Sequence, residues 1–191
     1  MTLNLDDPSE VALAASEAFE RAGLEVALYG GLALAIYGEP RETKDADLAV
    51  ATVTVEAGHQ ALAAAGIDGV IAFVSVRFGG LSIGRISLLG GGKLNMVDLV
   101  TPLSARFAAL VMKRAMRGAL DGQELRVVTP EDFILLKVLS TRFKDLEDAR
   151  SVVEALGDRL DRALLQAECD LLAVEIQDHD VRGRFATVMA S

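Results

Sequence analysis

The sequence is poor in the residues that form disulfides, aromatic stacking surfaces and histidine metal sites. Its 191 residues include one cysteine, two histidines and no tryptophan, and only 5% are aromatic. A single cysteine, Cys169, excludes a disulfide within the chain, and its apolar, helix-like neighbourhood favours a buried thiol. So few rings argue against stacking of bases on exposed aromatics as the main binding mode.

The sequence also lacks a long hydrophobic run and an excess of basic residues. No apolar stretch reaches the length of a membrane span, and the acidic first ten residues do not resemble a signal peptide. A formal charge of -9 and a pI near 4.7 argue against broad, sequence-independent binding of nucleic acid. We expect a soluble, cytoplasmic protein with no membrane partner.

What the sequence does have is a high apolar content, 51%, arranged in short periodic segments. In the first half, the spacing of apolar residues and the glycines that end helices predict helices alternating with strands. Three extended segments follow, and a hairpin at Gly90-Gly91-Gly92 joins the last two. The expected helices are 8–22, 32–37 and 53–65, and the expected strands are 25–29, 47–50, 69–76, 83–89 and 93–100.

The second half has mainly helical periodicity. It predicts a helix over 103–120, a short strand over 124–128 and a helix that begins at Pro130 with Thr129 as its cap. A helix over 143–156 follows, and an Asp158 with Asp161 cap pattern starts another that runs to about Glu168. The fold class is therefore α+β: a small mixed-sheet core flanked by helices (1–101), then a mostly helical lobe (102–191) that completes a cleft.

Three aspartates interrupt apolar strand patterns. Asp45 and Asp47 are two residues apart, so on an extended chain both carboxylates project from one face. Asp98 lies within a strand that otherwise looks buried. If strand 93–100 lies beside strand 47–50, the three form a site for Mg²⁺, and two such ions would activate an attacking hydroxyl and stabilise the departing pyrophosphate.

A glycine pair, Gly30-Gly31, lies between a predicted strand and a predicted helix. Such a turn presents backbone amides at the positive end of a helix, where phosphate binds well. The pair alone is a weak signal because many turns of this kind need glycine for steric reasons. Its position, fewer than twenty residues before Asp45, gives it weight.

The segment Tyr29-Gly30-Gly31 through Arg41-Glu42-Thr43-Lys44-Asp45-Ala46-Asp47 resembles the signature of the small nucleotidyltransferases of the DNA polymerase beta type. That signature is a glycine turn followed by R-x-T-x-D-x-D. The second half resembles the AbiEii-type nucleotidyltransferase toxins: Lys137 to Thr141 is similar to their K-x-x-x-[T/R] motif, and Asp145 to Asp148 to their D-x-x-D motif. The resemblance covers roughly residues 25 to 155. The family often has Gly-Ser where this chain has Gly30-Gly31.

The resemblance implies a metal-dependent enzyme that uses a nucleoside triphosphate, ATP among the candidates. Asp45, Asp47 and Asp98 would hold metal, and Gly30 and Gly31 would cradle the triphosphate. Lys137 would neutralise phosphate charge, and Asp148 would orient it or act near the acceptor hydroxyl. Arg41 and Thr43 flank the metal loop and would position it.

Each assignment has a structural alternative. Asp45 and Asp47 would fit a solvated turn with Lys44 as a surface partner, and Asp98 would fit a strand-edge carboxylate in water. Lys137 would fit a lysine that extends from an apolar face to solvent. Asp145 and Asp148 would fit surface ion pairs with Lys144, Arg142 or Arg150, which contribute little.

Two hypotheses about function follow. The first is transfer of a nucleoside monophosphate to an acceptor hydroxyl: tRNA, as the toxin of a toxin-antitoxin system with an antitoxin partner, or alternatively a protein side chain or an antibiotic-type small molecule. A basic stripe at helical spacing mildly favours RNA, although a solvated helix face explains it as well. It comprises Arg106, Lys113, Arg114 and Arg117. The second hypothesis is a non-catalytic binding or regulatory partner with the same fold.

Overall fold

The computed structural model describes residues 3–190, and its centre is a mixed seven-stranded sheet with the order β3-β4-β5-β2-β1-β7-β6. The strands are β1 (Ala27–Tyr29), β2 (Ala46–Ala49), β3 (Gly69–Phe78), β4 (Leu81–Gly90), β5 (Lys93–Pro102), β6 (Met116–Leu120) and β7 (Gln123–Val127). The strand β2 runs antiparallel to β1 and parallel to β5. The predicted α+β class is confirmed.

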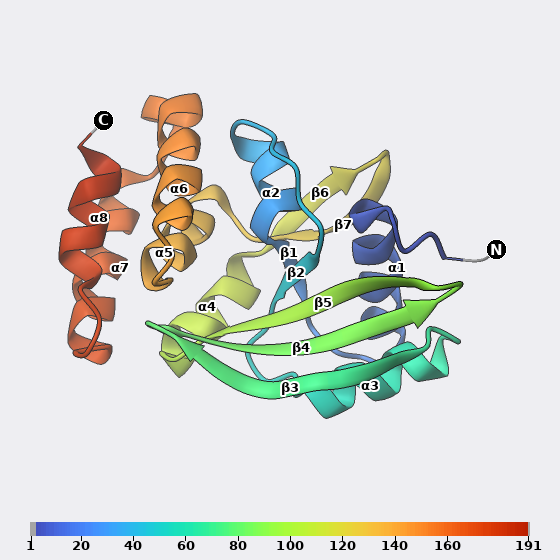
Figure 1. Ribbon diagram of the computed structural model, residues 1–191. Helices are drawn as coiled ribbons and strands as arrows, with labels where there is room; N and C mark the ends of the chain where they lie inside the picture. The colour runs from blue at the N-terminus through green and yellow to red at the C-terminus, as the bar shows by residue number, and fades with distance from the viewer. Residues whose placement is uncertain (1–2, 191) are drawn as a thin grey trace.

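Helices cover the sheet and form a bundle at one end of it (Figure 1). Two of them, α1 (Pro8–Arg21) and α3 (Val55–Ala64), pack against each other and against the sheet, while α2 (Gly30–Tyr37) links the sheet to the bundle through α6. The bundle contains α5 (Pro130–Leu139), α6 (Phe143–Leu156), α7 (Arg162–Glu175) and α8 (Val181–Met189); α4 (Ala105–Arg114) lies against β5. Within residues 3–190 no helix has the length and apolar character needed to cross a membrane.

The hydrophobic core extends through the bundle helix α5. Every residue of α5 from Asp132 to Leu139 is buried, because α6, α7 and α8 pack around this helix and Phe133 contacts Tyr29 of β1. Cys169 is buried and free, as expected. The hairpin at Gly91-Gly92 is confirmed, and both glycines have the positive φ that a tight two-residue turn requires.

The helix predicted over 103–120 is wrong in its second half. The chain leaves the helix at Ala115, and residues 116–120 form β6, which pairs with β7 through a turn at Asp121-Gly122. Both turn residues have positive φ, at 49° and 77°. Asp-Gly is a strong hairpin signal, and here the hairpin prevails over the helical spacing of the basic residues.

The end of the chain also differs from the prediction. Residues Gly157–Arg159 form a short 3-10 turn, and Asp161 rather than Asp158 caps α7 through the amide of Leu164. The helix then continues to Glu175, beyond the expected end near Glu168, and α8 follows it. The boundary at 101/102 stays a prediction; β6 and β7, which follow it, extend the sheet beside β1.

Candidate active site

The carboxylates predicted from sequence lie on adjacent strands. In the parallel pair of β2 and β5, Asp47 is the direct partner of Asp98, and across the antiparallel pair Asp47 faces Tyr29, the last residue of β1. Asp45 precedes β2 by one residue and lies close enough to Asp47 to raise the pKa of that carboxyl group. The strand register therefore brings the three aspartates together.

The glycine turn lies directly against this cluster. Gly30 has φ +69°, and a Cβ added to it would come within 1.9 Å of Asp47 Oδ2. A Cβ on Gly31 would lie 2.8 Å from Thr43. Glycine is needed at both positions because the loop and the carboxylate occupy the space of a side chain. No side chain caps the N-terminus of α2, so its first amides stay available to a ligand.

Asp47 is in an environment that disfavours its charge. Burial is the largest cause, and repulsion from Asp45 and then Asp98 adds to it; together they raise the pKa of Asp47 to about 7. Two carboxylates with a third beside them normally require a cation. This donor chemistry fits a divalent ion held by Asp45 and Asp47.

Asp98 lies beside Asp47 but has a cationic partner that the sequence analysis did not identify. Its side chain is 6% exposed, which rules out the water-exposed alternative, and both oxygens accept hydrogen bonds from Arg85 at 2.7 Å. Among the described residues no group of three acidic, histidine or cysteine side chains is arranged to hold a metal ion. Both carboxylate oxygens of Asp98 are occupied by Arg85.

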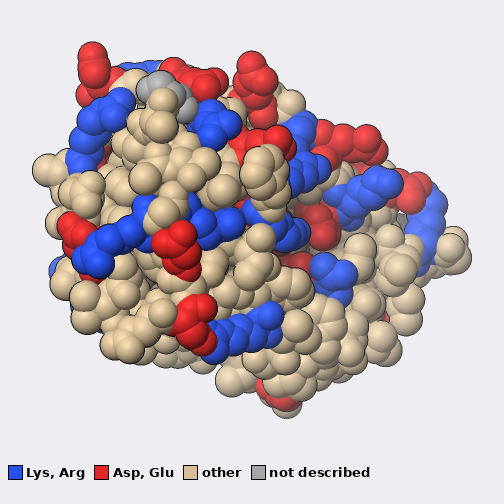
Figure 2. Space-filling model, turned by 60° about the vertical axis from the view of Figure 1, so that its left-hand side comes forward, with Lys and Arg blue, Asp and Glu red and all other residues tan. Residues whose placement is uncertain are grey.

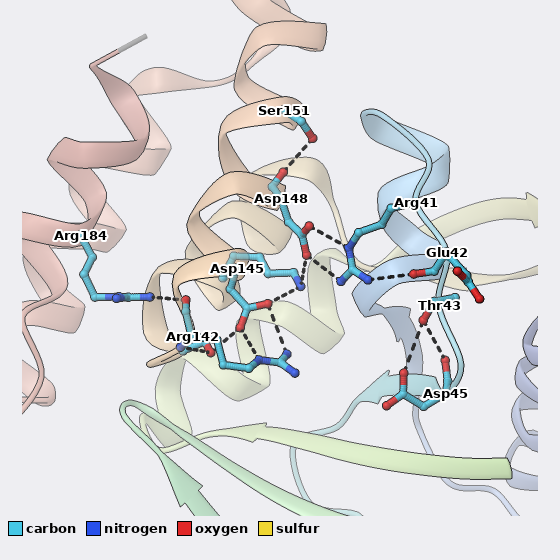
Figure 3. A network of polar contacts seen from close by, with 11 residues as sticks. Arg41, Glu42, Thr43, Asp45, Arg142, Asp145, Asp148, Ser151 and Arg184 are labelled. Carbon is cyan, nitrogen blue, oxygen red and sulfur yellow. Dashed lines mark hydrogen bonds and ion pairs between the residues drawn. The ribbon is translucent and has the colours of Figure 1, made fainter. Parts of the chain in front are cut away.

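The opposite side of the site is a chain of alternating charges on α5, α6 and the loop after α2 (Figure 3). Lys137 Nζ donates to Asp145 at 2.7 Å and to Asp148 at 2.8 Å. Arg41 reaches across to Asp148 with two bonds of 2.9 Å, and Arg142 donates to Asp145 at 2.8 and 3.2 Å. The second-half motif thus joins the glycine-turn loop to α6.

Burial excludes the surface interpretations of these residues. The side chains of Lys137 and Asp145 are 1% exposed, and that of Asp148 is 4% exposed. The Lys137 ammonium also lies 5.2 Å from the ring centre of Tyr29 and 5.3 Å from that of Phe133. Burial pushes the pKa of Asp145 up, but Lys137, Arg142 and Ser140 outweigh it and lower that pKa to about 2.

A cleft of about 460 Å³ lies between the two sides. One wall is the loop from Arg41 to Asp45 with Asp47, and the other is Arg142, Lys144 and Asp145. Lys137 is not in the lining and lies one layer behind it. A larger hollow of about 560 Å³ lies between the end of α1 and β6–β7, and its lining includes no predicted site residue except Arg117 of the basic stripe.

The predicted basic stripe is not a free face. Arg117 belongs to β6, while Arg106 pairs with Glu168 and Glu175, and Arg114 pairs with Asp132 and Glu168. Two arginines of the stripe that RNA would contact are therefore already paired with acidic side chains of α5 and α7. Lys113 remains exposed on α4.

Sequence reasoning missed Arg85. A signal for it existed, because the hairpin turn at Gly91-Gly92 fixes the register of β4 and β5. Counting back five residues on each strand from the pair Gly90–Lys93 reaches Arg85 and Asp98. A lone arginine opposite a lone aspartate in two apolar strands indicates a buried pair.

Comparison with known proteins supports the fold. No family model matches the chain, and no curated protein matches it. Among solved structures it resembles the aminoglycoside nucleotidyltransferase ANT(2″)-Ia, solved with adenylyl-2″-tobramycin, with a TM-score of 0.52 and 14% identity over 84% of this chain and 95% of that one. The chain therefore has a nucleotidyltransferase-like fold.

Gly30 provides a test of the site geometry. We expect Gly30→Ala to destabilise the protein by about 1 kcal/mol for the left-handed backbone and by about 2 kcal/mol more for the clash with Asp47. Gly23→Ala is the matched control, since Gly23 has φ +71° and an added Cβ meets nothing within 4 Å. Urea unfolding measures both. Equal losses in the two variants would contradict the close packing of Gly30 on Asp47.

Proposed function

We propose that this protein is a metal-dependent nucleotidyltransferase that transfers a nucleoside monophosphate from a nucleoside triphosphate to an acceptor hydroxyl and releases pyrophosphate. One observation carries the proposal: Asp47 lies against the Gly30 turn and, with Asp45, lines a cleft that also contains the cationic side chains of Arg41, Lys44, Arg142 and Lys144. The nucleotidyltransferase-like fold supports it.

In this proposal Asp45 and Asp47 hold the divalent ion, which when bound would polarise the α-phosphate and offset its charge. The amides of Gly30 and Gly31 receive phosphate oxygens at the start of α2. Thr43 donates to Asp45 at 3.4 Å and steadies the metal loop. Arg142 and Lys144, on the opposite wall, meet the phosphates across the cleft.

Lys137 is proposed to position the site. Its ammonium is buried and bound to two carboxylates, so it holds Asp145 and Asp148 in place. These in turn fix the guanidinium groups of Arg142 and Arg41. Direct neutralisation of phosphate, which the sequence motif suggests for Lys137, would require the lysine to leave both partners.

Two acceptor classes have support. The resemblance of residues 137–148 to the AbiEii-type toxins favours tRNA and an antitoxin partner. RNA would then meet cations other than the stripe; Figure 2 shows Lys and Arg side chains in a band, with acids among them, across the side that bears the C-terminal helices. Arg142, just before α6, and Arg182 of α8 are more than half exposed, although each also pairs with an acid, Asp145 and Asp170 respectively.

The second acceptor class is a small molecule. The solved structure with a similar fold carries an adenylylated aminoglycoside, and its chain is covered almost completely by this one. The pairing of Arg106 and Arg114 with acids also leaves less of the chain's basic charge for RNA. An acidic protein would attract a cationic acceptor.

The test is incubation of the protein with each α-labelled nucleoside triphosphate and Mg²⁺, in separate reactions with total RNA and with an aminoglycoside panel. We expect label in one product class, dependent on the ion. Label in RNA supports the toxin proposal, and label in an aminoglycoside supports the antibiotic-type one. No product in either reaction, together with no ion-dependent nucleotide binding, would overturn the proposal and favour the non-catalytic alternative.

A further inference from the structure

Arg85 is a cation built into the carboxylate cluster. It lies on β4 directly opposite Asp98 on β5, and its Nε and Nη2 each donate to a separate oxygen of Asp98 at 2.7 Å. The same Nη2 lies 3.7 Å from Asp45 Oδ2. The guanidinium carbon lies 5.5 Å from the ring centre of Phe73 on β3. Arg85 therefore bridges two of the three predicted metal ligands.

This pairing is rigid. A guanidinium that donates two parallel bonds to one carboxylate matches its geometry and uses both oxygens. The two residues are direct partners in the long β4–β5 hairpin, so the backbone holds them in register. Asp98 is 4% exposed, and removal of Arg85 would leave its charge buried without that partner.

The net charge of the cluster before nucleotide binds also matches one divalent ion. Asp45, Asp47 and Asp98 carry three negative charges and Arg85 offsets one of them. A single divalent cation offsets the remaining two. Arg85 does not hydrogen-bond to Asp47, and within residues 3–190 no cationic side chain donates a hydrogen bond to that carboxylate, which is paired in the sheet with Asp98.

We propose that Arg85 is a resident cation that keeps Asp98 out of metal coordination, so that the chain binds one divalent ion with its nucleotide, through Asp45 and Asp47. This inference rests on the proposed function. It replaces the two-ion, three-carboxylate site that the sequence suggested with one ion and a fixed arginine. Arg85 acts here as a positioning residue for Asp98.

The test counts bound Mn²⁺ by electron paramagnetic resonance, with the full chain and a triphosphate analogue whose α–β bridge is methylene. The wild-type complex is expected to hold one Mn²⁺. The Arg85→Met variant, in which Asp98 loses its arginine partner, is expected to hold two Mn²⁺ ions. Adding Asp98→Asn to that variant is expected to return the number of bound Mn²⁺ ions to one. Arg77→Met is the matched control, because Arg77 lies in the neighbouring strand in an exposed pair with Asp178, and it is expected to stay at one.

The outcomes separate this inference from the proposed function. Two ions in the wild-type complex, or an unchanged count in Arg85→Met, would overturn the role of Arg85 and leave nucleotidyl transfer intact. No Mn²⁺ in any nucleotide complex would overturn both. If Arg85→Met does not fold, Asp98→Asn in the otherwise wild-type chain decides: the complex is expected to keep one Mn²⁺ and to lose no more affinity than the about 10- to 100-fold typical of an outer-shell residue, whereas a larger loss would identify Asp98 as a ligand and overturn the inference.

Discussion

Replacing Asp47 with asparagine is expected to abolish nucleotidyl transfer and at the same time to make the folded protein more stable at pH 8. The expected loss of activity is at least about 1000-fold, because the variant loses a charged ligand at the centre of the proposed metal site. The gain in stability has a separate cause. Without a bound ion, the Asp47 carboxylate is destabilised by burial and by repulsion from Asp45 and Asp98, and asparagine removes that charge.

The sign of the pH dependence follows from the raised pKa of Asp47. A carboxyl group that binds its proton more tightly in the folded chain stabilises the fold fully below its ordinary pKa, 3.8, and that contribution is lost as pH rises to about 7. The full displacement corresponds to about 4 kcal/mol. Solvent reaches the half-buried side chain, so we expect about 2 kcal/mol.

Thermal unfolding in a chelator, at pH 5 and pH 8, measures this effect. The wild-type protein should lose stability between the two pH values relative to Asp47→Asn, and a divalent ion with nucleotide should restore it. Asp68→Asn, at an exposed loop position, is the control for loss of one acidic charge. Parallel pH profiles for wild type and Asp47→Asn would show that the cluster does not strain the fold.

Replacing Lys137 with methionine is expected to destabilise the protein by about 3 to 5 kcal/mol, since it removes the shared partner of two buried carboxylates. For a chain of this size that corresponds to a fall of about 10 °C in Tm. Arg41 and Arg142 remain bound to the two acids, which places the loss toward the lower end of the range.

The control for Lys137→Met is Lys93→Met, because Lys93 pairs with Asp6 at the surface and its loss should cost less than about 1 kcal/mol. Acid titration gives a second measurement. The pKa of Asp145 is lowered to about 2, so its ionised carboxylate stabilises the fold above pH 3.8. That contribution is lost as the pH falls toward 2. This acid-dependent loss should be smaller in Lys137→Met. A stability change equal to that of Lys93→Met would contradict the buried pairing of Lys137 with Asp145 and Asp148.

Several residues of the candidate site could be placed together from local sequence because they are close in the chain or fixed by strand geometry. Asp45 and Asp47 share a face through the two-residue repeat of a strand, and the Gly30 turn ends the preceding strand. The helix over 143–156 agrees with α6 for a similar reason, since its periodicity and Gly157 stop are local. The roles assigned to these residues remain predictions.

Partners distant in sequence were beyond local reasoning. Arg41 and Asp148 are 107 residues apart, and only packing of the loop after α2 on α6 brings them together. The basic residues of 106–117 read as one helical stripe because spacing alone does not reveal which of them face acids on α7. Helical periodicity also concealed β6, whose pairing with β7 depends on the Asp121-Gly122 turn.

The amino-acid sequence by itself determined the fold class, the glycine turn and the aspartate pair, because periodicity, turn residues and the alternation of a strand are short-range properties. The tertiary structure alone decided which charges meet. It placed Lys137 inside rather than at the surface and set Arg85 on Asp98. The physical reason is that a buried charge must find its partner in space, and that partner can come from any part of the chain.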